Sequence, residues 1–252
     1  MKKVVKVQIK DKYIDERGNV YNIRNINYES LEEARFNFGT FLTESKSDKF
    51  DSIDSDLDGI YLYKTIYDPK KVLRIYKDYP HYKYISHCDQ RIISELQSRQ
   101  KNIKLTDFPT GVVTIENIVI GQEIPYYEGF ETIRNIYQNN KYIKFPTYYY
   151  LEILKILKEL FKEGIIYKDI HSNNFLYKTF EECIKLIDFE PFEVRFDEGM
   201  NCNYNSMIDN LKAMIILLNS FSGIEFDSNF KKTKTLEEVE ESILENQKKL
   251  SR

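Results

Sequence analysis

Several residue types and patterns are scarce in this sequence, and each shortage excludes a class of protein. The three cysteines, Cys88, Cys183 and Cys202, are scattered and form neither a disulfide framework nor a cysteine-based metal site. The longest apolar run, 213–218, is far too short to cross a membrane. The longest basic cluster, 231–234, is too short for a nucleic-acid surface. We therefore expect a cytoplasmic protein with reduced thiols that binds neither membranes nor nucleic acids.

The residues that are present indicate a folded globular protein. Apolar residues make up 42% of the 252 positions and charged residues 31%, a composition well outside the disordered range. The start of the chain has a basic end but no continuous apolar core, so we expect no signal peptide there. The length fits one large domain or two small lobes.

The first half of the chain has the alternating, turn-punctuated pattern of β-strands. The polar, acidic segment 46–58 lacks the glycine and the closing glutamate of a calcium-binding loop, so we expect it to be solvated. The elements expected in this half are a hairpin over 3–25 with its turn at 16–19, a weak helix over 30–45, strands over 59–67 and 71–77, a helix over 86–100 and a second hairpin over 110–124.

The second half is dominated by helical periodicity. The clearest helix is expected over 147–163, where apolar residues form one stripe and Gly164 follows as a stop signal. Two further helices are expected over 204–220 and 235–250, the latter with a capping box formed by Thr235 and Glu238. A strand-rich half followed by a helix-rich half predicts two lobes, with a boundary near 125–129.

Three polar residues of the second half are the candidates for catalysis and metal binding. Asp169 and Asn174 lie five positions apart in the loop after the long helix, and Asp188 ends an apolar strand fourteen positions further on. The segments 175–178 and 184–188 are expected to pair as a hairpin that brings Asn174 and Asp188 together. Carboxylate and amide oxygens suit Mg²⁺, and a second carboxylate suits proton transfer from a hydroxyl.

This pattern resembles the protein-kinase-like superfamily, whose signature is H-R-D-x-x-x-x-N followed by D-F-G. The corresponding stretches here are "YKDIHSNN" from Tyr167 to Asn174 and "DFE" from Asp188. The resemblance implies Asp169 as catalytic base and Asn174 and Asp188 as Mg²⁺ ligands. It also implies an α+β, two-lobed fold with a small antiparallel-sheet N-lobe that carries one helix, and a mainly helical C-lobe. The lobes would cover 51–127 and 128–252, after an N-terminal extension over 1–50.

The sequence departs from the signature at several positions, and these departures bear on which molecule would accept the phosphate. Tyr167 and Lys168 replace the usual His-Arg, and Glu190 replaces the glycine of D-F-G. His171, two positions after the aspartate, resembles the loop of aminoglycoside phosphotransferases and choline-kinase-like enzymes. The segment between Asp188 and the next helix is short and has no A-P-E, which favours a small-molecule or atypical acceptor without excluding protein.

The resemblance extends more weakly into the first half. In register, "VLRIYK" places Arg74 where a kinase N-lobe carries its phosphate-contacting lysine, with Lys77 as a second candidate. Arg74 keeps the charge but has a broader, planar head. The helix partner would be Glu95, for which a solvated glutamate is nearly as good an interpretation. Only Gly59 remains of the glycine-rich loop. The stretch 121–129 resembles the hinge between lobes, whose backbone would border the adenine at Glu123, Ile124 and Tyr126. A Pro-Tyr turn with no ligand is an equally good interpretation of this stretch.

Two further side chains have two interpretations each. His171 is either a metal ligand or, as we expect, a hydrogen-bonding residue within its loop. Asp209 either braces the catalytic loop from a C-lobe helix or lies on the polar face of that helix.

Three functions fit the sequence. The first is an ATP- and Mg²⁺-dependent phosphotransferase acting on a hydroxyl of a protein or small molecule. The second is a pseudokinase that senses nucleotide or binds protein, favoured by Arg74 and the sparse glycine loop. The third is transfer of the nucleotide itself.

Overall fold

The structure is a computed structural model, and it divides into two compact units. Unit 1 comprises Met1–Ser98 and Phe108–Glu128, and unit 2 comprises Arg99–Asp107 and Gly129–Arg252. The structure describes residues 5–10, 23–28, 40–46, 59–64, 68–76, 86–115, 118–139, 147–178, 183–189, 194–196, 200–220, 226 and 228–250.

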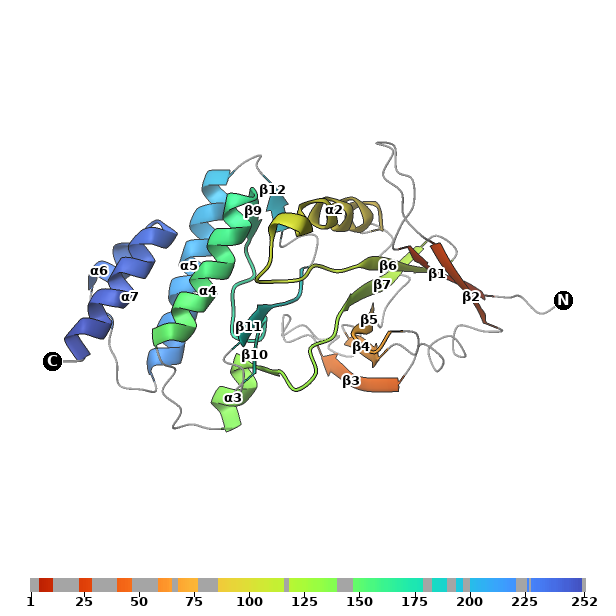
Figure 1. Cartoon of the computed structure of the whole chain (residues 1–252), viewed down its shortest axis with the longest axis horizontal. Coiled ribbons are helices and arrows are strands. Elements are labelled where there is room, and N and C mark those ends of the chain that lie inside the picture. Colours follow the sequence, from red (N-terminus) through yellow and green to blue (C-terminus); the bar gives the residue numbers. More distant parts are fainter. Residues whose placement is uncertain are drawn as a thin grey trace, which may run out of the picture. The chain divides into compact units, whose positions relative to one another are not determined.

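Unit 1 is built on one antiparallel sheet of seven strands, in the order β2-β1-β6-β7-β5-β4-β3 (Figure 1). A single described helix, α2, accompanies the sheet, and its Ile93 packs with Val112 of β6 in the core. The elements are β1 (Val5–Lys10), β2 (Ile23–Tyr28), β3 (Thr40–Lys46), β4 (Gly59–Lys64), β5 (Lys71–Tyr76), α2 (Ser86–Arg99), β6 (Gly111–Ile115) and β7 (Ile118–Pro125).

Most elements expected in the first half are present, with two corrections near its start. The hairpin expected over 3–25 is formed by β1 and β2, but its second strand begins at Ile23 instead of ending there. The helix expected over 30–45 is wrong from Thr40 onward, where β3 pairs with β4. The weak helical pattern there is overridden by the sheet, because strand pairing depends on neighbours distant in sequence. The turn at 16–19, residues 29–39 and the acidic loop at 47–58 lie outside the described residues.

Unit 2 is mainly helical. α4 packs against α7 and β9, and α5 packs against β9 and β12 (Figure 1). Two small sheets, β11-β10-β8 and β12-β9, accompany the helices. The elements are β8 (Glu131–Thr132), α3 (Ile133–Asn139), α4 (Thr147–Lys162), β9 (Ile165–Tyr167), β10 (Phe175–Lys178), β11 (Cys183–Leu186), β12 (Val194–Phe196), α5 (Met200–Ser220), α6 (Ser228–Lys232) and α7 (Leu236–Leu250).

The helices of unit 2 follow their sequence signals closely. Ile153, Leu154 and Leu157 of the α4 stripe are buried at 1% exposure or less. Gly164 ends the helix with a φ of 68°, a left-handed conformation that glycine adopts at little cost. At the start of α7 the Glu238 N–H donates to Thr235 Oγ1 at 3.1 Å, as the capping box predicts.

The segment 99–107 is bonded to α4 within unit 2. Glu159 Oε2 accepts the backbone N–H groups of Lys104 and Leu105 at 3.1 and 2.9 Å. Thr106 is fully buried, and its hydroxyl donates to the Leu186 carbonyl at 2.7 Å. This segment also begins with a short 3₁₀ helix, Gln100–Asn102. Unit 2 thus includes a short piece of the first half of the chain.

Candidate functional site

The loop from β9 to β10 carries the candidate site of unit 2, and its two ends are anchored in the core. Tyr167 at the end of β9 and Phe175 at the start of β10 are both fully buried. Ile170 in the middle of the loop is 4% exposed. Helix α5 holds the loop from outside, because Asn210 Nδ2 donates to the Lys168 carbonyl at 2.7 Å. These anchors fix the backbone that carries Asp169 and Asn174.

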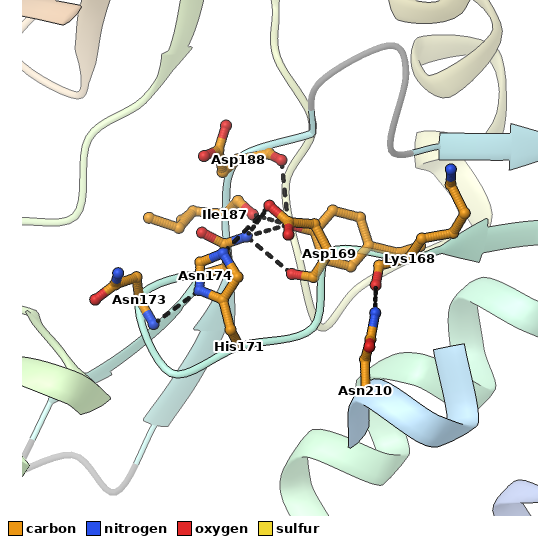
Figure 2. A network of polar contacts seen from close by, with 9 residues as sticks. Lys168, Asp169, His171, Asn173, Asn174, Ile187, Asp188 and Asn210 are labelled. Atoms are coloured by element: carbon orange, nitrogen blue, oxygen red, sulfur yellow. Dashed lines mark hydrogen bonds and ion pairs between the residues drawn. The ribbon is translucent and has the colours of Figure 1, made fainter. Parts of the chain in front are cut away.

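Asn174 is buried, and its amide nitrogen is bonded into the loop (Figure 2). Nδ2 lies 2.7 Å from the Tyr167 hydroxyl, 2.9 Å from the Asp169 carbonyl and 3.0 Å from Asp169 Oδ2. Figure 2 shows the side-chain oxygen turned away from Asp169. Within the described part of the chain no group donates to that oxygen. The amide therefore presents its oxygen, the atom that a hard cation takes.

A second donor fixes Asp169 from the other direction. His171 Nε2 lies 3.2 Å from Asp169 Oδ2, and the Asn173 N–H donates to His171 Nδ1 at 3.3 Å (Figure 2). Because Nδ1 accepts a hydrogen bond, the proton of the neutral ring is on Nε2 and points at the carboxylate. The hydrogen-bonding interpretation of His171 is thereby confirmed. Two donors, from Asn174 and His171, converge on Oδ2 of Asp169.

The hairpin of β10 and β11 brings Asp188 to the same loop. The paired residues run from Phe175 with Leu186 to Lys178 with Cys183. On the loop side, the Ile187 N–H donates to the Asn174 carbonyl at 2.9 Å and extends the pairing by one residue. The hairpin predicted from the sequence is thus confirmed. Asp188 follows with a φ of 67°, the one non-glycine residue in the described chain with a positive φ.

Unit 1 holds the residues predicted to contact nucleotide. Arg74 of β5 is buried at 6% exposure and lies opposite Gln122 of β7 in the strand register. Glu95 is partly buried on α2, and its carbonyl accepts the Ser98 hydroxyl. The second cation considered for the phosphates, Lys77, lies outside the described residues.

The predicted hinge residues are strongly tied into the sheet of unit 1. Glu123 is fully buried, and its Oε1 lies 2.8 Å from both Lys71 Nζ and Thr110 Oγ1. Its carbonyl accepts the Thr110 N–H at 2.7 Å. The Tyr126 N–H donates to the Lys70 carbonyl, while Ile124 lies opposite Val72. These two backbone groups, the Glu123 carbonyl and the Tyr126 N–H, thus have partners in the sheet.

Sequence reasoning missed two residues that organise the loop. Tyr167 bonds to the backbone of Ile187 and Asp188 as well as to Asn174. Asn210 braces the loop, whereas its neighbour Asp209 pairs with Lys212 and is 72% exposed, so the polar-face interpretation of Asp209 is the correct one. For Tyr167, the replacement of the usual histidine of the motif was the available signal. For Asn210 there was no such signal, because its contact with Lys168 joins residues distant in sequence.

The described residues contain no group of three or more His, Cys, Asp or Glu arranged to hold a metal ion. A set of one carboxylate and one amide, completed by phosphate oxygens and water, is nevertheless a usual way for proteins to hold Mg²⁺. No helix in the described part of the chain is long and apolar enough to cross a membrane.

Solved structures of a kinase domain share the fold of the chain. Two structures of the PknI kinase domain of Mycobacterium tuberculosis, one a double mutant, match with TM-scores of 0.54 and 0.53 at 10% identity, over 83% of this chain and 98% of that chain. A further double mutant matches with a TM-score of 0.53 at 9% identity, over 84% and 97%. No protein-family model matches the chain, and no curated protein matches its sequence.

The chain has a protein-kinase-like fold. It is the α+β, two-lobed kind, with an antiparallel sheet and one described helix in unit 1 and a mainly helical unit 2. Compared with the strands expected for the N-lobe, the sheet of unit 1 is wider, because β1, β2 and β3 from the first 50 residues belong to it. At 10% identity, this similarity shows the fold alone.

Proposed function

We propose that the chain is an ATP-dependent, Mg²⁺-requiring phosphotransferase that transfers the γ-phosphoryl group to a hydroxyl of a protein or small-molecule acceptor. The observation that carries this proposal is the hydrogen-bonded loop of unit 2, in which Asp169, Asn174 and the backbone of Asp188 are joined through shared partners. A buried polar network of this kind holds its members in one geometry, as phosphoryl transfer requires.

The donor set of this loop fits Mg²⁺. Asn174 holds its nitrogen inward through three contacts and presents its oxygen, and Asp188 supplies a carboxylate next to the residue that pairs with Asn174. We assign Asn174 and Asp188 as the ligands. Bound Mg²⁺ would neutralise the phosphate charge and orient the phosphates.

We assign Asp169 as the base that orients and deprotonates the acceptor. Its carboxylate is held by His171 and Asn174, so it does not have to be ordered when the acceptor arrives. The acceptor oxygen forms a bond to the γ-phosphorus while the bond from that phosphorus to the oxygen of the departing ADP breaks. The hydroxyl proton moves to Asp169.

In unit 1 we assign Arg74 or Lys77 to the phosphates, with Glu95 as the partner of that cation. Glu123, Ile124 and Tyr126 are assigned to the border of the adenine. The Glu123 carbonyl and the Tyr126 N–H already have partners, and Pro125 has no N–H, so contact with the base falls to side chains and the remaining backbone groups. A cytoplasmic location belongs to this proposal and agrees with the scattered cysteines, of which Cys183 is a free thiol in the structure.

The second candidate is a pseudokinase that binds nucleotide or protein without transfer. Two observations favour it: the buried cation on β5 is an arginine, and the glycine-rich loop is reduced to Gly59. A planar guanidinium does not replace a lysine ammonium in contact with a phosphate without a change of geometry.

The test uses purified full-length protein with Mg²⁺ and γ-labelled ATP. We expect turnover or self-labelling, a nucleotide-dependent rise in melting temperature, and a loss of activity of at least about a hundredfold in Asp169→Asn. In Asp188→Ala we expect loss of activity and of the Mg²⁺-dependent part of the thermal shift. Binding without turnover would favour the pseudokinase. Unchanged activity in both variants would refute the site, and the mass of a modified acceptor separates phosphate from nucleotide transfer.

A further inference from the structure

The hydroxyl of Tyr167 lies at the point where the loop and the Asp188 segment meet. Tyr167 is fully buried, and its Oη is 3.2 Å from the Ile187 carbonyl, 3.2 Å from the Asp188 carbonyl and 2.7 Å from Asn174 Nδ2. Its ring lies beside that of Phe189, with ring centroids 5.3 Å apart. A phenylalanine would fill nearly the same space, so the hydroxyl is present in the core for its hydrogen bonds.

The direction of each hydrogen bond follows from the donors available. A phenol has one proton, which it shares between the carbonyls of Ile187 and Asp188, and it accepts the N–H of Asn174 through a lone pair. The 2.7 Å contact to Asn174 is shorter than the two contacts from Nδ2 to Asp169. The bond to Tyr167 therefore favours the amide orientation of Asn174 in which the nitrogen points inward and the oxygen outward.

The same hydroxyl supports an unusual backbone. Asp188 has a φ of 67°, a left-handed conformation that is unfavourable for a residue with a Cβ. The bond from Tyr167 to the Asp188 carbonyl fixes one side of that peptide group and therefore opposes relaxation to a more common conformation.

We propose that Tyr167 is a positioning residue that sets the orientation of two side chains at once, the amide of Asn174 and the carboxylate of Asp188. This inference rests on the proposed function, in which those two side chains hold Mg²⁺. Tyr167 itself contacts neither nucleotide nor metal, and acts only through the residues that it orients. Removal of the hydroxyl should therefore weaken Mg²⁺ and leave metal-free nucleotide binding unchanged.

The experiment measures binding of Mn²⁺, a spectroscopic substitute for Mg²⁺, to full-length protein saturated with ADP, by electron paramagnetic resonance. We expect Tyr167→Phe to weaken Mn²⁺ binding roughly tenfold, the low end of the range for outer-shell changes at metal sites. ADP affinity without metal should stay within about twofold. In activity assays the half-saturating Mg²⁺ concentration should rise by a similar factor.

Two comparisons separate positioning from lost stability. Tyr150→Phe removes another buried hydroxyl, on α4 of the same unit, and should leave Mn²⁺ affinity unchanged whatever its effect on the melting temperature. 4-Aminophenylalanine at 167 keeps a donor to the two carbonyls but is a poor acceptor for Asn174 Nδ2, so it should restore only the part of the affinity that depends on Asp188. If Tyr167→Phe does not fold, 4-fluorophenylalanine, which fills the volume without donating, takes its place.

The outcomes for the inference and for the proposed function are distinct. Wild-type protein that binds no Mn²⁺ in the presence of ADP refutes both. Wild-type protein that binds Mn²⁺, together with Tyr167→Phe protein of equal affinity, refutes the positioning role of Tyr167 alone. Equal losses in Tyr167→Phe and Tyr150→Phe also refute it, since the effect would then be one of general stability.

Discussion

At the scale of single residues, two hydrogen bonds hold the imidazole of His171 between the Asn173 backbone and the Asp169 carboxylate. In His171→Ala, Asp169 loses one of the two donors that converge on its Oδ2 and keeps the one from Asn174, so the carboxylate gains freedom to rotate. We expect kcat to fall about tenfold, since small displacements of a base are costly to the rate. The KM for ATP should hardly change. Steady-state kinetics at saturating Mg²⁺ measure both quantities.

The control for this substitution is the neighbouring amide. The Asn173 side chain has no hydrogen-bond partner in the described chain, and only its backbone N–H takes part in the network. Asn173→Ala should therefore keep wild-type kcat. A His171→Ala enzyme with wild-type kcat would show that His171 does not hold Asp169 for catalysis.

Tyr167 and Asn210 illustrate what local sequence could not predict. The spacing of Asp169, Asn174 and Asp188 predicts their proximity, because a tight loop and a hairpin are local structures. The contact from Asn210 to Lys168 joins residues 42 positions apart and depends on how α5 packs. Tyr167 was visible only as a departure from a motif, and its hydrogen bonds to Ile187 and Asp188 required the hairpin to be in place.

At the scale of elements, the end of α4 holds the segment 99–107 through Glu159. In Glu159→Ala the N–H groups of Lys104 and Leu105 lose their acceptor. We expect unfolding free energy to fall by about 1–2 kcal/mol and the melting temperature by roughly 3–6 °C. Glu152→Ala on the same helix removes only an exposed pair with Lys155 and should change stability by less than about 0.5 kcal/mol. Calorimetry measures both, and equal melting temperatures would contradict the role of Glu159.

Elements with a strong period were predicted and elements decided by distant neighbours were not. The stripe of α4 fixes that helix whatever surrounds it, since Ile153 and Leu157 recur at helical spacing. The segment that becomes β3 has no such pattern. It is a strand because β4 lies beside it. Phe41 pairs with Tyr63, and the register shifts between Phe41 and Thr43.

At the scale of the whole molecule, substitutions of two threonines can test whether the two units open independently of each other. Thr106 bonds to the Leu186 carbonyl within unit 2, and Thr110 bonds to Glu123 within unit 1. Thr106→Val should lower the hydrogen-exchange protection of β10 and β11 about tenfold, because a buried carbonyl loses its donor. Strands β4 and β5 should be unaffected.

Thr110→Val provides the reciprocal measurement. It should lower protection in β5 and β7 by a smaller factor, because Glu123 keeps the ion pair with Lys71, and it should leave β10 and β11 unchanged. Exchange is followed by mass spectrometry of peptides from each unit. Loss of protection in both units after either substitution would show that the two units open together.

The place of β1 in the sheet has a consequence for synthesis on the ribosome. β1 lies between β2, which follows it closely, and β6, whose Ile115 pairs with Val7 from roughly a hundred residues away. The first hairpin is therefore complete long before its second neighbour exists. Until β6 emerges, one edge of β1 has unpaired backbone groups, and other nascent chains can pair with such an edge. A pause in translation before Gly111 should accordingly increase aggregation, whereas a pause after Pro125 should not.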